Sequence, residues 1–320
     1  MKFKRYHSIE NGHNVKYIDK IILSELAKDN IMYSVTEKCH GSNMQTTSDG
    51  INIRHGKRSS FIANDSNFRN FQSLKEDIDK KTSLLFEKLK NEREIDEVRI
   101  YYEIAGDKVQ TGIFYSKKQF LYIFDIAIIK DEIETFLDVD DFIELCEEFN
   151  FFYAKELFRG TLKECMKYTN KYNSHIPIWL DENKNDIPEV NICEGNVIKP
   201  VKNIYLNDKR IIIKNKNENW TETIAKNKIN WSKDITKLEL SEEPKRLLNE
   251  LLLLNSENRL KNVMSKLETF NFGKLLGLMN KDIFEEFNKN YSLKHLDVKD
   301  KKRINKFLNF KISLLINKKK

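Results

Sequence analysis

One short segment of the sequence places a lysine beside a turn. The segment is TEKCHGSN (Thr36 to Asn43), in which Lys38 ends a strand-like stretch and Cys39-His40-Gly41 enters a turn. A lysine amine attacks a phosphoryl group only when it is deprotonated and well placed, and burial or nearby cations lower the pKa of such an amine. Lys38 is therefore a candidate nucleophile for phosphoryl transfer.

Other parts of the sequence supply cations that can serve the same phosphate. Lys214 and Lys216 stand two residues apart in a predicted strand, so both side chains lie on one face of it. Lys57 and Arg58 follow a predicted hairpin and can return a third positive centre to the site. Taken singly, these residues are weak indications, because most strand-face lysines in a chain with 56 lysines and arginines are solvated surface side chains. The set in this order is much less expected by chance.

From residue 31 to 216 the sequence predicts an antiparallel sheet with a few amphipathic helices. Ile31 to Lys38 alternates as a strand does, and Asp49-Gly50 is a hairpin turn signal between two further strands. Apolar residues recur at helical spacing over residues 68–89 and 142–149. The alternation of EVRIYYEIA (residues 97–105) puts Glu103 opposite an apolar row, so one face should build the core and the other a site.

After an asparagine-rich and lysine-rich stretch near residues 217–235, only helical patterns remain. Ser241 is the predicted N-cap of a leucine-rich helix, and further helices are predicted at Glu257 to Leu267, Lys281 to Asn288 and Lys299 to Asn317. A boundary near residues 235–240 therefore separates an α+β domain from a small all-α domain.

The positive charge of the chain is concentrated in its C-terminal part. Residues 239–320 contain 18 basic and 11 acidic residues, which equals the whole net charge of +7, whereas residues 1–238 contain 38 of each. Surplus positive charge attracts phosphate polyanions. The alternative is a solvated basic tail, since residues 318–320 are all lysine.

The composition also indicates in which cellular compartment the protein is expected. The four cysteines stand far apart without a C-x-x-C pair, which argues against a zinc site and predicts free thiols in a reducing compartment. The longest apolar run, residues 120–129, is short and interrupted by Asp125, so neither a signal peptide nor a membrane span is expected. These features predict an intracellular, cytoplasmic protein.

The chemistry-bearing residues also follow a known order. The series resembles motifs I, Ia, III, IIIa, IV and V of covalent nucleotidyltransferases, carried here by Lys38-x-x-Gly41, Arg58, Glu103 in YYEIAG, Phe124-Asp125 in IFDI, Glu194 in EGNVIKP, and Lys214 with Lys216 in IIIKNK. Lys38-x-His40-Gly41 resembles the RNA ligase 2 family, including the kinetoplastid RNA-editing ligases, whereas DNA ligases and capping enzymes typically carry aspartate in place of the histidine. The opening RYHSIEN and the C-terminal NRLKNVMSKLETFNFGKLLGL are also similar to the phage member, so the resemblance covers nearly the whole chain.

The resemblance implies an α+β fold: an antiparallel-sheet nucleotidyltransferase (ATP-grasp-like ligase) domain over residues 1–235, then a helical RNA-binding domain over residues 239–320. It implies an ATP-dependent RNA ligase, in which Lys38 takes AMP from ATP, passes it to a 5′-phosphate, and a 3′-hydroxyl displaces AMP. The expected partner is RNA, at nicks in duplexes, with no obligate protein partner and no membrane. A virus-encoded enzyme in the host cytoplasm fits as well.

The same resemblance implies roles for particular residues. The catalytic set is Lys38, His40, Lys214 and Lys216. The implied nucleotide contacts are the Glu37 backbone and the Phe124 ring at adenine, Glu103 at the ribose hydroxyls, Asn43 and Arg58 at ribose or phosphate, Lys214 and Lys216 at the α-phosphate, and Lys199, which closes motif IV. Glu194 is the implied ligand of Mg²⁺ or Mn²⁺.

Two positions depart from the family pattern. Tyr102 stands where a glycine often precedes the motif III glutamate, and Asn196 replaces a common apolar residue in motif IV. Asp125 is equally consistent with a structural acid. The open alternatives are an inactive ligase-fold protein that binds RNA, and a DNA ligase or capping-type enzyme; the latter two normally continue into a β-rich OB domain after motif V, where this chain predicts helices.

Overall fold

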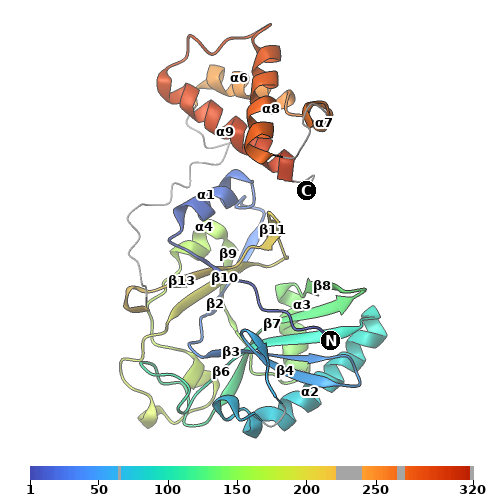
Figure 1. The fold of residues 1–320 in the computed structure, drawn as a ribbon. Helices are drawn as coiled ribbons and strands as arrows, with labels where there is room; N and C mark the ends of the chain where they lie inside the picture. The colour runs from blue at the N-terminus through green and yellow to red at the C-terminus, as the bar shows by residue number, and fades with distance from the viewer. Residues whose placement is uncertain (64–65, 221–239, 265–270, 318–320) are drawn as a thin grey trace. The chain divides into compact units, whose positions relative to one another are not determined.

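The computed structural model describes residues 1–63, 66–220, 240–264 and 271–317. These residues form two compact units (Figure 1). The first comprises Met1–Tyr17 and the described residues from Ala27 to 220; the second comprises Ile18–Leu26 and the described residues from 240 onward. The predicted domain boundary at 235–240 lies outside the described residues except for residue 240. The predicted basic tail at 318–320 lies wholly outside them. Among the helices described, none has the length and apolar character needed to cross a membrane.

The first unit contains a five-stranded sheet in the order β1-β13-β10-β2-β9. Its strands are β1 Glu10–Asn11, β2 Met32–Glu37, β9 Glu156–Thr161, β10 Gly195–Pro200 and β13 Ile213–Lys216. All neighbours are antiparallel except β1 and β13, which are parallel. The strand predicted from Ile31 is β2, and its Tyr33 and Val35 are fully buried because the sheet is covered there.

A six-stranded antiparallel sheet follows the order β5-β4-β3-β6-β7-β8. Its strands are β3 Ser42–Ser48, β4 Ile53–Lys57, β5 Ser60–Phe61, β6 Glu97–Ala105, β7 Phe120–Lys130 and β8 Ile133–Phe136. The predicted Asp49-Gly50 hairpin joins β3 to β4, and Gly50 has a φ of +85°, a conformation that glycine adopts without steric cost. A separate two-stranded sheet pairs β11 (Tyr205–Leu206) with β12 (Lys209–Arg210).

Two helices cover one face of the six-stranded sheet, α2 (Gln72–Arg93) and α3 (Val139–Glu148) (Figure 1). The prediction of a helix from residue 68 was wrong at its start. Residues 68–70 form a separate 3-10 turn, η1, because Arg69 and Asn70 take φ values of 52° and 56° that a continuous helix does not allow. The short helical elements of this unit and its border are α1 Val15–Leu23, α4 Leu162–Lys167, α5 Ile176–Trp179, η2 Lys184–Asp186 and η3 Glu218–Trp220.

The two faces of β6 serve different purposes. Its apolar row, from Val98 to Ile104, lies in the core beneath α2 and α3, as the alternation predicts. The opposite face is also largely buried, because the N-terminal segment crosses it: Arg99 Nη2 donates to the carbonyl of Lys2 at 3.1 Å, and the rings of Tyr6 and Tyr101 lie 4.8 Å apart. Glu103 stands at the end of this covered face, where a cavity opens.

In the second unit, the described residues from 240 onward contain four helices and no strand. The helices are α6 Glu242–Leu253, α7 Glu257–Met264, α8 Phe272–Phe287 and α9 Val298–Asn317. Leucines of α6 and apolar residues of α8 and α9 share one core. Ser241 occupies the N-cap of α6 without a side-chain capping hydrogen bond, and α8 begins nine residues before the predicted Lys281, since Phe272 and Leu275 extend its apolar face.

Candidate active site

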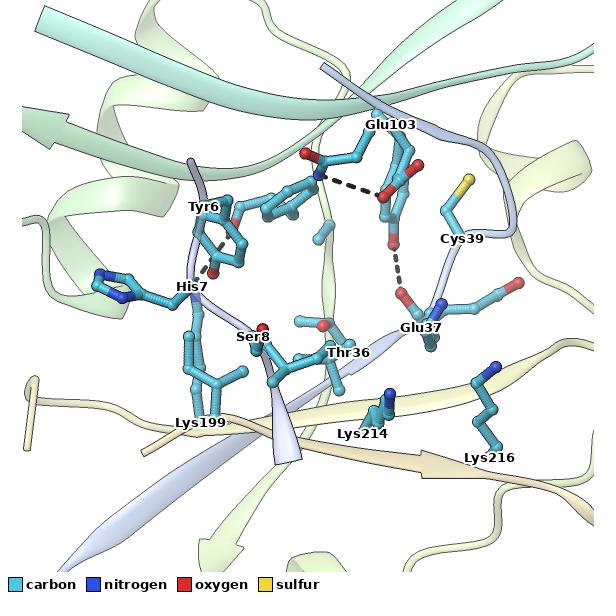
Figure 2. A pocket seen from close by; sticks show the side chains of 18 of the residues that line it. Tyr6, His7, Ser8, Thr36, Glu37, Cys39, Glu103, Lys199, Lys214 and Lys216 are labelled. Atoms are coloured by element: carbon cyan, nitrogen blue, oxygen red, sulfur yellow. Dashed lines mark hydrogen bonds between the residues drawn. The ribbon is translucent and has the colours of Figure 1, made fainter. Parts of the chain in front are cut away.

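A cavity of about 280 Å³ lies where the two large sheets meet, and both sheets contribute side chains to it (Figure 2). Nine of the eleven predicted site residues line it: Glu37, Lys38, Asn43, Arg58, Glu103, Phe124, Lys199, Lys214 and Lys216. The two others, His40 and Glu194, are not among the lining residues but contact Lys38 or its ion-pair partner. Sequence positions 37 to 216 are thus brought to one place by strands β2, β3, β6, β7, β10 and β13.

A single buried carboxylate organises one wall of the cavity. Glu194 is 2% exposed, and its Oε2 lies 2.6 Å from Lys38 Nζ while its Oε1 lies 2.9 Å from Lys216 Nζ. The next residue, Gly195, has a φ of +135°, and a Cβ there would lie 2.3 Å from the carbonyl oxygen of Asn215. This close approach of β10 to β13 requires glycine and brings Glu194 against Lys216.

The charges around Glu194 keep it ionised. Burial alone raises the pKa of its carboxyl, but the nearby His40 side chain and the charges and hydrogen bonds of Lys38 and Lys216 outweigh burial and lower the pKa to about 2. At neutral pH the carboxylate therefore holds the lysines in place and is a weak base.

His40 contacts this cluster from the side. Its Nδ1 lies 3.6 Å from Glu194 Oε2, and its ring packs at 4.7 Å from the ring of Trp220. Its backbone N–H donates to the hydroxyl of Tyr115 at 2.8 Å, which fixes the turn after Lys38. The arrangement suits a residue that orients the carboxylate and its lysines.

Glu103 lies on the opposite wall (Figure 2). Asn43 Nδ2 donates to its Oε1 at 3.4 Å. Burial raises the pKa of Glu103 to about 7, against the opposing effects of Lys38 and Asn43. The preceding Tyr102, which departs from the family pattern, is fully buried with its hydroxyl 2.9 Å from Thr46 Oγ1, and β6 has a register shift against β7 between Tyr101 and Tyr102. The Glu103 side chain nevertheless faces the cavity.

Lys214 and Lys216 project from β13 toward the cavity on the side away from Glu103 (Figure 2). They stand on one face of the strand, as their spacing predicts. Glu37, at the end of β2, has its carboxylate bound by the Ser174 hydroxyl and the His175 backbone N–H, and its carbonyl accepts from the Tyr122 hydroxyl at 3.0 Å. The loop at 174–175 thus holds the Glu37 side chain, and a backbone role at adenine stays a prediction.

A second buried acid, Asp125, supports the floor of the cavity. It is fully buried and accepts hydrogen bonds from the Tyr6 hydroxyl at 2.8 Å and from Arg210 Nη1 at 2.6 Å. Lys199 Nζ lies 3.5 Å from Asp125 Oδ1 and donates to the carbonyl of Phe124 at 3.1 Å. Burial raises the pKa of Asp125, and the Arg210 and Lys199 charges outweigh it, so the pKa is lowered. Asp125 is in the position of a structural acid.

Sequence reasoning missed one wall of the cavity. Tyr6, His7, Ser8 and Ile9 line it, and Figure 2 shows the first three crossing the side near Lys199. In the sequence, RYHSIEN stands out only by its family resemblance, and no local pattern marks His7. The available signal was that resemblance itself, because a segment shared with a relative yet lacking a structural pattern is a candidate for a site.

The side chains of the cavity can be compared with those that usually bind divalent metal ions. Across the described residues no group of three or more His, Cys, Asp or Glu side chains could enclose an ion. Mg²⁺ is commonly held by one or two carboxylates with water and substrate phosphates. Glu194, whose two oxygens lie against Lys38 and Lys216, is the carboxylate that would serve here, and its role as a metal ligand stays a prediction.

Comparison with known proteins decides the family. Residues 32–216, more than half of the chain, match the family model described as RNA ligase. The chain belongs to the RNA ligase family. Residues 238–313 match the model described as T4 RNA ligase 2 C-terminal, which agrees with the resemblance of the C-terminal sequence.

Solved structures agree with this RNA ligase assignment at the level of fold. A Naegleria gruberi RNA ligase mutant with ATP and Mn is similar with a TM-score of 0.51 at 15% identity, covering 69% of this chain and 58% of that chain. The Naegleria gruberi RNA ligase with PPi gives a TM-score of 0.50 at 16% identity, covering 68% of this chain and 57% of that one. The RNA ligase chain described here thus spans under two thirds of these relatives' length.

Proposed function

We propose that this RNA ligase family member joins RNA ends through ATP-dependent adenylyl transfer, with Lys38 as the nucleophile. The observation that carries the proposal is the placement of Lys38 Nζ at the cavity, 2.6 Å from Glu194, with Lys214 and Lys216 on the same wall and Glu103 facing them. The family match and the ATP and Mn named in a relative's title support the choice of nucleotide and metal.

In the first step, the neutral amine of Lys38 attacks the α-phosphorus of ATP. An N–P bond forms, the bond from the α-phosphorus to the bridging oxygen breaks, and pyrophosphate leaves. Before the attack Lys38 gives up its proton, and Glu194 is too weak a base to keep it, so water or the departing phosphate takes it. Lys214 and Lys216 offset the charge that develops on the α-phosphate. A Mg²⁺ or Mn²⁺ ion at Glu194 would neutralise further phosphate charge.

Other lining residues hold the nucleotide in line. The Glu103 carboxylate accepts hydrogen bonds from ribose hydroxyls, Asn43 and Arg58 contact ribose or phosphate, and Phe124 stacks on adenine above the Glu37 backbone. Lys199, bound to Asp125, fixes the floor. These contacts set the angle between the Lys38 amine and the leaving group, which is the geometric part of the rate acceleration.

In the following steps, AMP passes from Lys38 to the 5′-phosphate of an RNA strand. A 3′-hydroxyl then attacks that phosphate, a phosphodiester forms and AMP leaves. We assign the nucleotide chemistry to residues 1–235 and the grip on RNA to residues 239–320, where the positive charge is concentrated. A-form duplexes present phosphates and 2′-hydroxyls as a shape, which favours nicked duplexes as substrates.

The test is covalent labelling. Purified protein incubated with Mg²⁺ and ATP labelled at the α-phosphate should carry the label, and GTP labelled in the same way should leave it unlabelled. An inactive RNA-binding protein would take no label from either nucleotide, and labelling by GTP would indicate capping-type chemistry. Sealing of nicked RNA but not nicked DNA duplex separates the RNA ligase from a DNA ligase.

A further inference from the structure

A second cavity of the first unit, about 720 Å³ in volume, has no part in the proposed nucleotide chemistry. Two segments line it, residues 67–74 and residues 107–119. We call it the cationic groove, because its lining includes four cations and a single acid, Asp107: the cations are Arg69, Lys108, Lys117 and Lys118. The amides of Asn67, Asn70 and Gln119 and the hydroxyl of Ser73 complete its polar surface.

This charge is a local concentration. Residues 1–238 contain equal numbers of basic and acidic residues, so four cations against one acid do not follow from composition. Lys117 pairs with Asp186 at 2.6 Å and Lys108 lies 3.5 Å from Asp107. Within the described part of the chain, Arg69 and Lys118 have no carboxylate partner in ion-pair range. Among the described residues, therefore, two of the four charges have no carboxylate that neutralises them.

The backbone of the groove is held in an uncommon conformation. Arg69, Asn70 and Lys108 take φ values of 52°, 56° and 58°. Such conformations cost free energy in residues other than glycine, so the surrounding contacts hold the two segments in a defined shape. Gln119 Nε2 donates to the carbonyl of Asp107 at 3.0 Å, which ties the two ends of the loop together.

The groove is also close to the nucleotide cavity along the sheet. Its loop joins β6 to β7, the strands that carry Glu103 and Phe124. Asp107 follows Glu103 by four residues and Gln119 precedes Phe124 by five. At about 3.3 Å per residue, the groove begins about 13 Å along the chain from Glu103 and about 17 Å from Phe124. The groove and the nucleotide cavity therefore share the strands β6 and β7.

We propose that the cationic groove binds the sugar-phosphate backbone of the RNA strand whose end is being joined. The proposal rests on the RNA ligase function proposed above. Arg69 suits two oxygens of one phosphate and Lys118 a neighbouring phosphate, while the amides and Ser73 suit 2′-hydroxyl and phosphate oxygens. Cations spread over two segments in a groove of this volume fit several nucleotides better than a single small anion.

The test uses the full chain and a fluorescently labelled RNA duplex with one nick. The variant Arg69→Ala/Lys118→Ala should bind this duplex roughly tenfold more weakly. The slope of log affinity against log salt concentration should become shallower by the amount expected for the loss of about two phosphate contacts. The matched control, Lys163→Ala/Lys167→Ala on α4, removes the same charge from another exposed surface and should bind as the unmodified protein does. Self-labelling by ATP should be unchanged in both.

Further variants separate charge from folding. Arg69→Lys/Lys118→Arg keeps the charge and should retain RNA affinity, whereas the single change Lys118→Glu, at an exposed side chain, should weaken it without loss of ATP labelling. Unchanged RNA affinity and salt slope in Arg69→Ala/Lys118→Ala or in Lys118→Glu would overturn the proposal and leave the groove to another class of ligand. If the unmodified protein takes no label from ATP while the groove variants lose RNA affinity, the ligase function fails, and the groove remains an RNA-binding site without a role in joining ends.

Discussion

Positive charge is arranged differently in the two units of the molecule. In the first unit, Lys38 and Lys216 lie against the buried carboxylate of Glu194, and their side chains are 19% and 23% exposed. In the second unit, Lys299, Lys302 and Lys306 are exposed along the single helix α9. The lysines at Glu194 are held in defined positions by the carboxylate, whereas the lysines of α9 give a whole surface a positive potential.

This difference predicts different energetic consequences. Removing one member of a desolvated charge cluster leaves its partners buried without compensation, which costs much more than the pair itself contributes. Exposed charges are screened by salt and contribute little individually. Substitutions in the first unit should therefore act on chemistry by orders of magnitude, and substitutions on α9 should act on RNA affinity by small factors.

The largest effect is expected for Lys38→Ala. This variant should take no label from ATP, because it removes the amine that is proposed to form the bond to AMP. It should still seal RNA that already carries 5′-AMP, at least weakly, since that step needs no new lysyl adduct. Labelling and sealing of pre-adenylylated RNA are measured side by side. Persistent labelling of Lys38→Ala would remove Lys38 from the proposed role.

Next in size are Glu194→Ala, Lys214→Ala and Lys216→Ala. Each should lower the rate of self-labelling by roughly two to three orders of magnitude, as expected for a preorganised charge removed from a site of low solvent content. Glu194→Gln is the matched control, because it keeps shape and removes charge. If Glu194→Gln labels at the normal rate while Glu194→Ala does not, the residue acts by packing alone and the electrostatic interpretation is wrong.

A smaller effect concerns pH and Glu103. Its pKa is raised to about 7, so the carboxylate that accepts ribose hydroxyls is mostly protonated at pH 6 and mostly ionised at pH 8. Nucleotide binding favours the ionised form, so affinity should increase roughly tenfold from pH 6 to pH 8, with proton release on binding near pH 7. The ligand is an ATP analogue with a methylene group between the α- and β-phosphates, which Lys38 cannot cleave.

Glu103→Gln provides the control for this prediction. The phosphates of the analogue titrate in the same range, but they contribute equally to both proteins. The difference in pH dependence between the unmodified protein and Glu103→Gln therefore isolates the carboxyl group. Parallel pH curves for the two proteins would mean that Glu103 does not contact the ribose.

The parts of the site that the sequence predicted depend on local patterns. Lys38 follows a strand with period-two alternation, the Asp49-Gly50 turn fixes the next hairpin, and Lys214 with Lys216 share a strand face by their spacing. The unpredicted parts depend on contacts between distant segments. Tyr6 bonds to Asp125, 119 residues away in sequence, and no local period marks either residue. The sequence did not predict that α2 starts only after η1, because the φ values of Arg69 and Asn70 follow from tertiary packing.

The smallest expected effect tests the helical unit, and the structure decides how to make that test. A fragment ending near residue 235 lacks the helical core against which Leu23 packs. It also lacks Lys311, whose Nζ lies 3.7 Å from Glu25 Oε1. Its loss of sealing would therefore mix lost RNA contacts with exposure of residues 18–26. The cleaner variant is Lys302→Ala/Lys306→Ala in the full chain, because both side chains are exposed on α9.

Lys302→Ala/Lys306→Ala should leave labelling by ATP and thermal stability unchanged. Its affinity for a nicked RNA duplex should fall only severalfold at low salt, and the difference should vanish at high salt as counterions screen the surface. Lys281→Ala/Lys289→Ala on and just after α8 removes equal charge from side chains already paired with Glu285 and Glu286, and should have a smaller effect. Both double variants could instead bind RNA as the unmodified protein does at every salt concentration. The positive charge of α9 would then have no part in RNA binding, and only the charges of the first unit would have a functional role.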